Sequence, residues 1–284
     1  MRQTSGHRVG IVTDSTSYLP PALVVDDLLT IVPVHVVIAG TAYDEGVDVA
    51  PSQVAAALRQ WQVVTTSRPT PECFVDAYES LAQAGATAIV SIHLSALMSG
   101  TYESAVIAAR SAPVPVAVVD SETVAMALGF AVLSAAAAAA RGEDLAEVAR
   151  TAQDRAAASS ALFYVDTLDF LRRGGRIGAA QALLGQALAV KPILTVAHGK
   201  VCPLEKVRTA ARALARLEEL ALARAEGRVV DLAVHHLDAA DRAEALAQRL
   251  AVRLPDANIV VSEVGAVVGA HVGPGMVAVV VAPR

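Results

Sequence analysis

The sequence has few of the residues that build disulfide-stapled, metal-bound or nucleic-acid-binding proteins. It contains 2 cysteines in 284 residues, and Cys73 and Cys202 lie far apart and outside any metal-ligand spacing. This favours two buried thiols in a reducing compartment over a disulfide or a metal site. The formal net charge is −5, so the concentrated basic face that a phosphate backbone requires is missing. We therefore expect no metal and no nucleic-acid partner.

Targeting, membrane and cofactor signals are also scarce. The first residues contain no apolar segment before a cleavage site, so a cytoplasmic protein is expected. The apolar run from Val124 to Ala140 is shorter than the roughly 20 residues of a spanning helix and is mostly alanine, which predicts a core helix and no integral membrane segment. Neither a Walker A motif nor a Rossmann glycine fingerprint follows the first strand, which argues against a nucleotide-dependent enzyme, and we expect no cofactor.

What is present is ample apolar sequence arranged in alternating strands and helices. The apolar fraction is 54%, and the length suggests two domains. Alternating strand and helix patterns predict an α/β fold in which residues 1–160 form a parallel sheet flanked by helices. A hairpin turn near His198, together with the helices around it, predicts a C-terminal α+β domain, residues 161–284.

Four local predictions depend on turn and capping signals. The run from Ile31 to Ile38 predicts one strand near a sheet edge, interrupted by Pro33. The acidic stretch 43–48 lacks the ligand pattern of a calcium loop and predicts a solvated turn. Two long helices are expected to begin at Asp120 and at Lys206.

The most informative stretch is the turn that carries Ser99. A buried strand over residues 86–90 precedes it, and a helix over residues 103–110 follows it. The free N–H groups at Gly100, Thr101 and Tyr102, together with the helix dipole, would form a seat for an anion, to which Ser99 adds a hydroxyl. For an isolated Ser-Gly-Thr, a simple N-cap is the alternative interpretation.

Other polar residues each allow a structural and a functional interpretation. Thr66 lies at a second expected strand-to-helix turn, and His271 lies among glycines and a proline that force a turn able to present the imidazole. Arg208, at an expected helix start, opposes the dipole, which suggests another reason for its presence. The cluster of Arg172, Arg173 and Arg176 is either a solvated helix end or a basic dock for an acidic partner.

Five segments, in this order and spacing, resemble the DegV family of bacterial fatty-acid-binding proteins nearly end to end. They are VTDST at 12–16, TTSRPT at 65–70, MSGTY at 98–102, FLRRGGRI at 170–177 and GAHVGPG at 269–275.

The resemblance implies a carrier that is not itself an enzyme. It implies a long-chain fatty acid, such as palmitate, in an apolar tunnel between or beneath the two domains, with the carboxylate presented to a separate ATP-dependent fatty acid kinase. That kinase would make acyl phosphate for phospholipid synthesis. The residues that match the family's carboxylate site are Thr66, Ser99, Gly100, Arg208 and His271. Those that match its partner-docking surface are Arg172, Arg173 and Arg176.

The competing interpretation is a serine esterase or thioesterase. Ser99 would be the nucleophile and His271 the base. Against it, Leu97 stands where the first glycine of a Gly-x-Ser-x-Gly elbow should be. No aspartate near His271 in the sequence is an obvious orienting partner, although an acid can come from elsewhere in a fold.

Overall fold

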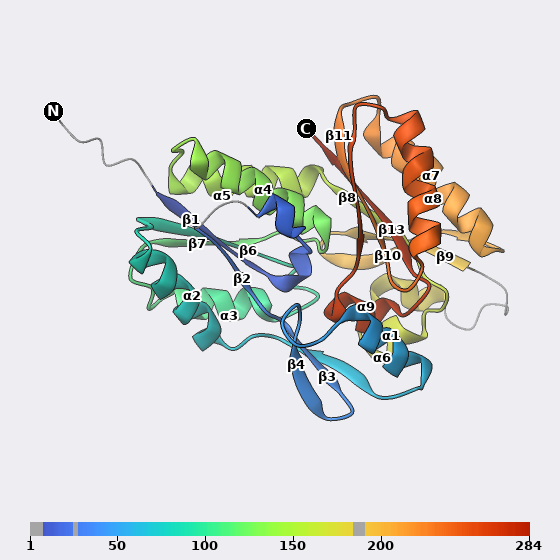
Figure 1. The fold of residues 1–284 in the computed structure, drawn as a ribbon, viewed down its shortest axis with the longest axis horizontal. Helices are drawn as coiled ribbons and strands as arrows, with labels where there is room; N and C mark the ends of the chain where they lie inside the picture. The colour runs from blue at the N-terminus through green and yellow to red at the C-terminus, as the bar shows by residue number, and fades with distance from the viewer. Residues whose placement is uncertain (1–7, 25–27, 184–190) are drawn as a thin grey trace.

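The computed structural model describes residues 8–24, 28–183 and 191–284. Within these residues the strands form sheets of four, six and three strands, and helices cover both faces of the four-stranded sheet (Figure 1). The α/β class expected from the alternating pattern is confirmed by this architecture.

The four-stranded sheet is parallel, in the order β2-β1-β6-β7. Its strands are β1 (Val9–Asp14), β2 (Leu29–Val32), β6 (Ala88–His93) and β7 (Val116–Asp120). Helices α2 (Pro71–Gln83) and α3 (Thr101–Ala109) cover one face, and α4 (Met126–Ala140) and α5 (Leu145–Ala158) cover the other (Figure 1). Ile11 packs under α4 and α5, and Val12 packs under α2 and α3. Both faces are buried, so these strands read as continuous apolar runs.

The six-stranded sheet is mixed, in the order β10-β9-β8-β13-β11-β12. Its strands are β8 (Ser160–Tyr164), β9 (Lys191–Ala197), β10 (Lys200–Val207), β11 (Val230–His236), β12 (Asn258–Glu263) and β13 (Val277–Pro283). Helices α7 (Ala210–Ala225) and α8 (Ala240–Arg253) pack on one face of it. Along β13, Val277, Val279 and Val281 pack under these helices. The alternate residues Ala278 and Val280 point to the opposite face, because side chains on a strand alternate.

A small antiparallel sheet, β4-β3-β5, joins the two halves. It is built from β3 (His35–Ile38), β4 (Thr41–Asp44) and β5 (Val64–Ser67), with α1 (Pro51–Arg59) beside it. Val36, Val54 and Leu58 from this region pack against Val267 and Ala270 of α9 (Ala266–Val272). A boundary near residue 160 therefore separates the two large sheets, but the small sheet packs its core against the C-terminal half.

The predicted single strand from Ile31 to Ile38 is wrong. β2 ends at Val32 and β3 begins at His35, and the two belong to different sheets. Pro33 lacks an N–H for a ladder, and the next N–H, of Val34, donates to Ser15 Oγ at 3.0 Å instead.

Two predicted helix starts are also wrong. Helix α4 begins at Met126, because Asp120 Oδ1 accepts hydrogen bonds from the N–H groups of Ala96 and Glu122 and fixes a loop. Helix α7 begins at Ala210, after β10 has continued to Val207. In both cases a polar residue read as a helix start belongs to a preceding strand or loop.

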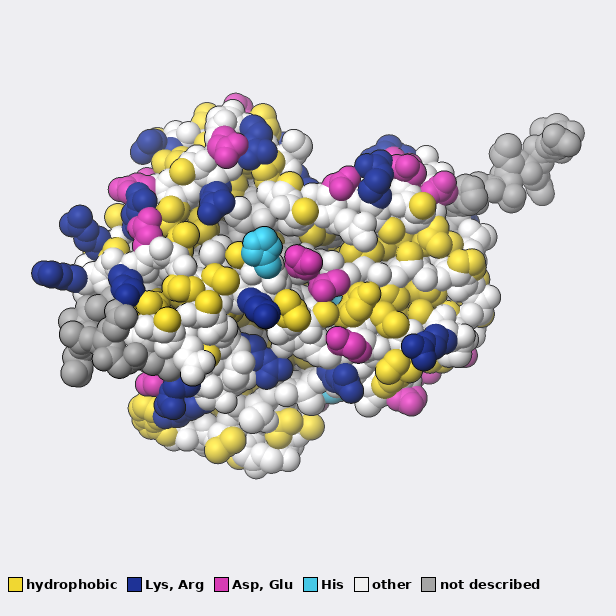
Figure 2. Space-filling model, turned by 180° about the vertical axis from the view of Figure 1, so that it is seen from behind, with side chains coloured by type: hydrophobic (Ala, Val, Ile, Leu, Met, Phe, Trp, Pro, Cys, Tyr) yellow, Lys and Arg dark blue, Asp and Glu magenta, His cyan; other side chains and the backbone are white. Residues whose placement is uncertain are grey.

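The remaining described elements are short. They are α6 (Asp169–Arg173) and the 3₁₀ turns η1 (Ser15–Ser17), η2 (Pro21–Leu23) and η3 (Gly178–Leu183). None of the helices in the described ranges is long and apolar enough to span a bilayer. Cys73 and Cys202 are free and half-buried. On the face in Figure 2, basic and acidic side chains are interspersed.

Candidate functional site

An apolar cavity lies against the face of the six-stranded sheet that α7 and α8 leave uncovered. Its volume, as the space open to the centre of a water-sized sphere, is about 100 Å³. By that measure one water needs roughly 10–15 Å³, so the cavity has room for a chain of several heavy atoms. Its apolar lining consists of Val34, Leu94, Met98, Val124, Ala125, Ala161, Leu162, Phe163, Leu171, Val196, Val201, Val264, Val267, Val268, Val272, Met276, Ala278 and Val280.

Five of the six polar side chains of the lining form a group that draws on both halves of the chain. The group consists of Thr66, Ser67, Ser99, Arg176 and His271. Thr66 Oγ1 lies 2.9 Å from His271 Nε2, which joins β5 to α9 across 205 positions of sequence. Arg176 Nε donates to the carbonyl oxygen of Met98 at 2.9 Å, directly before Ser99.

A sixth polar residue of the lining, His235, has no hydrogen-bonding capacity left for a ligand. Its Nε2 accepts from the N–H of Met126 at 3.3 Å, and its Nδ1 lies 3.1 Å from Ser262 Oγ. Burial lowers the pKa of His235 to about 4, so the ring is neutral at pH 7. His235 therefore contributes surface to the cavity, and the free polar groups are confined to the group around His271.

His271 lies on the last turn of helix α9, so the prediction that its own position is a turn is wrong. Its Nδ1 is buried and has no hydrogen-bond partner in the described part of the chain. A Cβ on Gly174 would lie 2.0 Å from this nitrogen, so the ring rests against a glycine that leaves it space. An unpaired lone pair costs less than an unpaired N–H, which favours the tautomer whose Nε2–H donates to Thr66.

The electrostatic surroundings keep His271 neutral. Burial, and then the charge of Arg176, lower the pKa of His271 to about 4. Since Nε2–H then occupies one lone pair of Thr66 Oγ1, the Thr66 hydroxyl proton is directed elsewhere. His271 thus donates to Thr66, and the Thr66 hydroxyl is left to donate at the polar end of the cavity.

The turn at Ser99 combines the two roles that the sequence allowed. Helix α3 begins at Thr101, with Gly100 as its N-cap, two residues before the predicted start. Ser99 Oγ accepts from the N–H of Thr101 at 3.3 Å and lies 2.8 Å from Thr101 Oγ1, yet it also lines the cavity. Gly100 is not part of the described lining. A Cβ on it would lie 2.4 Å from Nη1 of Arg68, an exposed side chain that can move aside, so packing does not require a glycine here.

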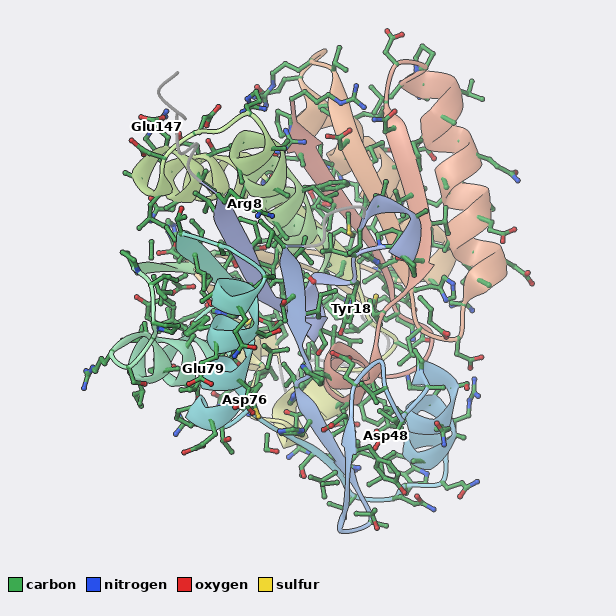
Figure 3. The ribbon with its side chains drawn as sticks, turned by 60° about the vertical axis from the view of Figure 1, so that its left-hand side comes forward. Arg8, Tyr18, Asp48, Asp76, Glu79 and Glu147 are labelled. Carbon is green, nitrogen blue, oxygen red and sulfur yellow. The ribbon has the colours of Figure 1, made fainter. Side chains whose placement is uncertain are left out.

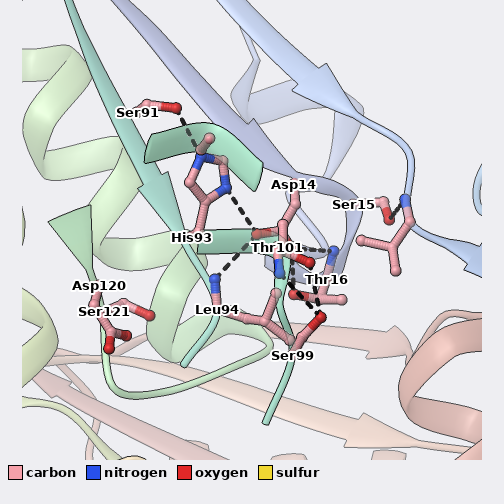
Figure 4. A network of polar contacts seen from close by, with 12 residues as sticks. Asp14, Ser15, Thr16, Ser91, His93, Leu94, Ser99, Thr101, Asp120 and Ser121 are labelled. Atoms are coloured by element: carbon pink, nitrogen blue, oxygen red, sulfur yellow. Dashed lines mark hydrogen bonds and ion pairs between the residues drawn. The ribbon is translucent and has the colours of Figure 1, made fainter. Parts of the chain in front are cut away.

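A buried network fixes the strand that leads into this turn (Figure 4). Asp14 Oδ2 lies 3.0 Å from His93 Nδ1 and accepts from the N–H of Leu94 at 3.0 Å, while its Oδ1 accepts from the N–H of Thr16 at 3.1 Å. Ser91 Oγ lies 2.7 Å from His93 Nε2. Asp14 therefore both caps the segment after β1 and supports the strand before the Ser99 turn. His93 was not singled out, although β1 and β6 end at the same sheet edge.

The three arginines expected on one partner-facing surface are divided. Arg172 and Arg173 are exposed; Arg172 lies 3.6 Å from Asp169, and Arg173 stacks 4.9 Å from the centre of the Trp61 ring. Arg176 is half-buried and lines the cavity instead. Arg176 is thus placed at the cavity, and a partner-docking role for the arginines stays a prediction.

Arg208 does not lie at the cavity. It is exposed in the segment between β10 and α7 and is absent from the described lining. Thr209 is the N-cap of α7 and accepts from the N–H of Arg212 at 3.2 Å, so Arg208 directly precedes the helix and is not part of its first turn. The cation that the structure places beside His271 is Arg176.

Sequence reasoning missed Glu45, which was expected in a solvated turn. Glu45 is 5% exposed and accepts hydrogen bonds from Ser15 Oγ at 2.6 Å, Tyr18 OH at 3.3 Å and the N–H of Val267 at 2.7 Å. Burial is the main cause that raises the pKa of Glu45 to about 7. Tyr18 lies near the centre of the molecule in Figure 3 and also accepts from the N–H of Val268 at 3.2 Å. Both residues thus hold the first turn of the helix that carries His271.

The geometry offers little to a serine hydrolase. A nucleophilic serine needs a base within reach, and that base needs an orienting group. Ser99 Oγ contacts Thr101, whereas His271 Nε2 contacts Thr66 and its Nδ1 has no acid beside it among the described residues. Nor do these residues contain a group of three side chains able to hold a metal ion.

The fold and the cavity define a class: an α/β protein with one parallel and one mixed sheet and an apolar cavity that has a single polar end. A family model described as "Uncharacterised protein, DegV family" matches residues 8–284. A DegV domain-containing protein of Streptomyces coelicolor is 57% identical, with 97% of this chain and 99% of that protein covered. The chain belongs to the DegV family, as its five motifs indicated.

Solved structures of similar proteins share the whole fold. A fatty-acid-binding DegV family protein of Thermus thermophilus is 35% identical with a TM-score of 0.91, covering 98% of this chain and 100% of that one. DegV of Bacillus subtilis, a fatty-acid-binding protein, is 31% identical with a TM-score of 0.90, at the same coverage.

Proposed function

We propose that this protein binds a long-chain fatty acid, such as palmitate, with its tail in the cavity and its carboxylate at the polar end. The observation that carries the proposal is the arrangement of the lining: an apolar wall from both halves of the chain with one polar group, around His271. The fatty acids bound by the Thermus and Bacillus proteins support the same ligand class.

The tail and the head of the ligand contribute differently to the free energy of binding. About fifteen methylenes at roughly 0.8 kcal/mol each would give an upper bound near 12 kcal/mol if the whole tail were buried, and the described cavity covers only part of that length. Loss of translational freedom and ordering of the tail offset much of this. Each charged hydrogen bond to the head contributes about 1.5–3 kcal/mol. The apolar wall therefore dominates affinity, and the polar end decides which end of the ligand lies there.

The carboxylate would be held by hydroxyls and turned toward a partner. The Thr66 hydroxyl, freed for donation by His271, and the Ser99 hydroxyl are the proposed donors. We further propose that a separate ATP-dependent fatty acid kinase converts the presented carboxylate into acyl phosphate for phospholipid synthesis. The exposed Arg172 and Arg173 support a docking surface, because Gly174, which follows them directly, touches the ring of His271.

Mass spectrometry of the intact purified protein tests the ligand. We expect one fatty acid per chain, removal of that acid by delipidation, and its return on incubation with palmitate. Protein that purifies empty and takes up no palmitate would contradict the proposal. Turnover of p-nitrophenyl esters that Ser99→Ala abolishes would favour the hydrolase instead.

The partner is tested with the double substitution Arg172→Glu and Arg173→Glu. We expect loss of kinase-dependent acyl-phosphate formation and unchanged palmitate loading, since neither side chain lines the cavity. Arg253→Glu, on the exposed last turn of α8, is the matched charge control. A double variant that folds but fails to load palmitate would show that the pair serves the cavity and not a partner.

A further inference from the structure

Arg176 is the cation that lines the cavity in the described part of the chain, and it has no carboxylate partner there. Its guanidinium is held by two backbone carbonyls: Nε donates to Met98 at 2.9 Å and Nη1 to Gly174 at 2.8 Å. No described carboxylate lies within 4.0 Å of it.

Arg155 shows how the same chain treats another poorly exposed arginine. The Arg155 side chain is 11% exposed and is paired with Asp231, itself 18% exposed, at 2.5 Å. Charges removed from water are normally paired, because their desolvation is otherwise uncompensated. Carbonyl dipoles satisfy N–H groups of Arg176 but leave its net charge without a counter-ion. The cavity beside it is thus a place where an anion is stabilised.

The position of Arg176 selects the part of the ligand that it meets. Met98 belongs to the turn that continues into Ser99, and Gly174 touches the His271 ring. The guanidinium therefore lies between the two segments that supply the polar end. The charge of Arg176 also contributes to the lowered pKa of His271, which is consistent with their proximity. Since His271 is neutral, the positive charge at this end must come from Arg176.

We propose that Arg176, and not Arg208, is the counter-ion of the ligand carboxylate, and that it makes the site selective for an acid over an uncharged chain of equal length. This assignment rests on the proposed fatty-acid binding and adds the residue that recognises the negative charge of the ligand. A guanidinium suits the role because it stays ionised. Some of its N–H groups can donate to the two backbone carbonyls while the remaining ones donate to the carboxylate.

The test compares palmitate with hexadecan-1-ol in the delipidated full-length protein and its Arg176→Gln, Arg176→Lys and Arg253→Gln variants. We expect Arg176→Gln to weaken palmitate binding by about tenfold or more and to change alcohol binding much less. Arg176→Lys keeps the charge and should retain part of the preference for the acid. Arg253→Gln, on the surface of α8, should behave as the wild type.

Two outcomes separate this inference from the proposed function. Wild-type protein that binds neither ligand would overturn fatty-acid binding itself. Wild-type protein that binds palmitate, combined with equal losses for acid and alcohol in Arg176→Gln, would overturn only the role of Arg176.

A second measurement holds even where Arg176→Gln fails to fold. Palmitate labelled with ¹³C at its carboxyl group can be titrated by NMR in the wild-type complex. The guanidinium of Arg176 should lower the pKa of the bound acid more than the ammonium of Arg176→Lys does. The ammonium cannot donate to both backbone carbonyls, so its charge is held less firmly beside the carboxylate. A bound-acid pKa raised above 7 in the wild type would show an acid buried without a counter-ion and would overturn the assignment.

Discussion

Two histidines, His93 and His271, have surroundings that differ in how completely their ring nitrogens are hydrogen-bonded. His93 is fully buried, and both ring nitrogens have partners, in Asp14 and Ser91. His271 has one partner, Thr66, an unpaired Nδ1 and an unpaired arginine beside it. A completed network stabilises a fold, whereas an incomplete one at a cavity is available for a ligand. The difference therefore assigns structure to the first histidine and binding to the second.

Removing the completed network should have the largest effect on stability. Asp14→Ala leaves the N–H groups of Thr16 and Leu94 and the His93 ring without their acceptor, in a region closed to water. We expect a loss of about 3 kcal/mol or more in the free energy of unfolding of the unliganded protein, measured with urea. Thr87→Ala, near the exposed end of the same sheet, is the control. A loss below about 1 kcal/mol would remove the structural role of this network.

Glu45 gives the next effect, as a pH dependence. Its pKa is about 7 in the folded protein and near 4.5 when unfolded. Below pH 4.5 the carboxyl is protonated in both states. Between pH 4.5 and 7 the unfolded state releases the proton first, so stability falls as pH rises, by at most about 3 kcal/mol.

Glu45→Gln should remove this slope. Its amide stays neutral, and its oxygen can still accept from Tyr18 OH and the N–H of Val267, so the variant should equal the wild type near pH 4.5 and exceed it at pH 8. Thermal unfolding of the delipidated proteins across this range measures the difference. An equal pH dependence of thermal stability in the two proteins would show that folding does not raise the pKa of Glu45.

These two carboxylates also show what sequence can and cannot reveal. Asp14 ends a strand, so parallel-sheet logic placed it at an edge where ligands bind. Glu45 lies in an acidic stretch that predicts a solvated turn. It is buried only because Tyr18 and helix α9 pack against it, and α9 lies more than 200 residues further along the chain. Local patterns specify strands and edges, but not which distant element will cover a loop.

At the polar end of the cavity, too, local patterns indicated some residues but not how the chain folds around them. Local strand and turn signals, together with the family motifs, indicated Ser99, Thr66 and His271. Arg176 was grouped with Arg172 and Arg173 because the three are adjacent in sequence. Gly175, at φ +69°, turns the chain between them, so the last arginine faces inward. A glycine pair signals such a reversal but does not give its direction.

Replacing the incompletely bonded histidine should cost affinity and not stability. His271→Ala removes the donor that directs the Thr66 hydroxyl, so we expect palmitate binding to weaken by about tenfold and hexadecan-1-ol binding to change less. Palmitate should also raise the melting temperature of the wild type and protect residues 269–275 from hydrogen exchange. Equal losses for both ligands, without protection of that segment, would leave His271 a packing role.

The smallest effect should come from Ser99, which belongs to both categories. Its hydroxyl accepts from the N–H of Thr101, so Ser99→Ala removes one interaction at the start of α3 and should cost about 1 kcal/mol of unliganded stability. The same hydroxyl faces the cavity, so palmitate affinity should fall as well. Ser99→Thr keeps the hydroxyl and should recover the stability, whereas its added methyl group tests the space at the polar end. A full loss of stability with unchanged palmitate affinity would place Ser99 beside His93, as part of the scaffold.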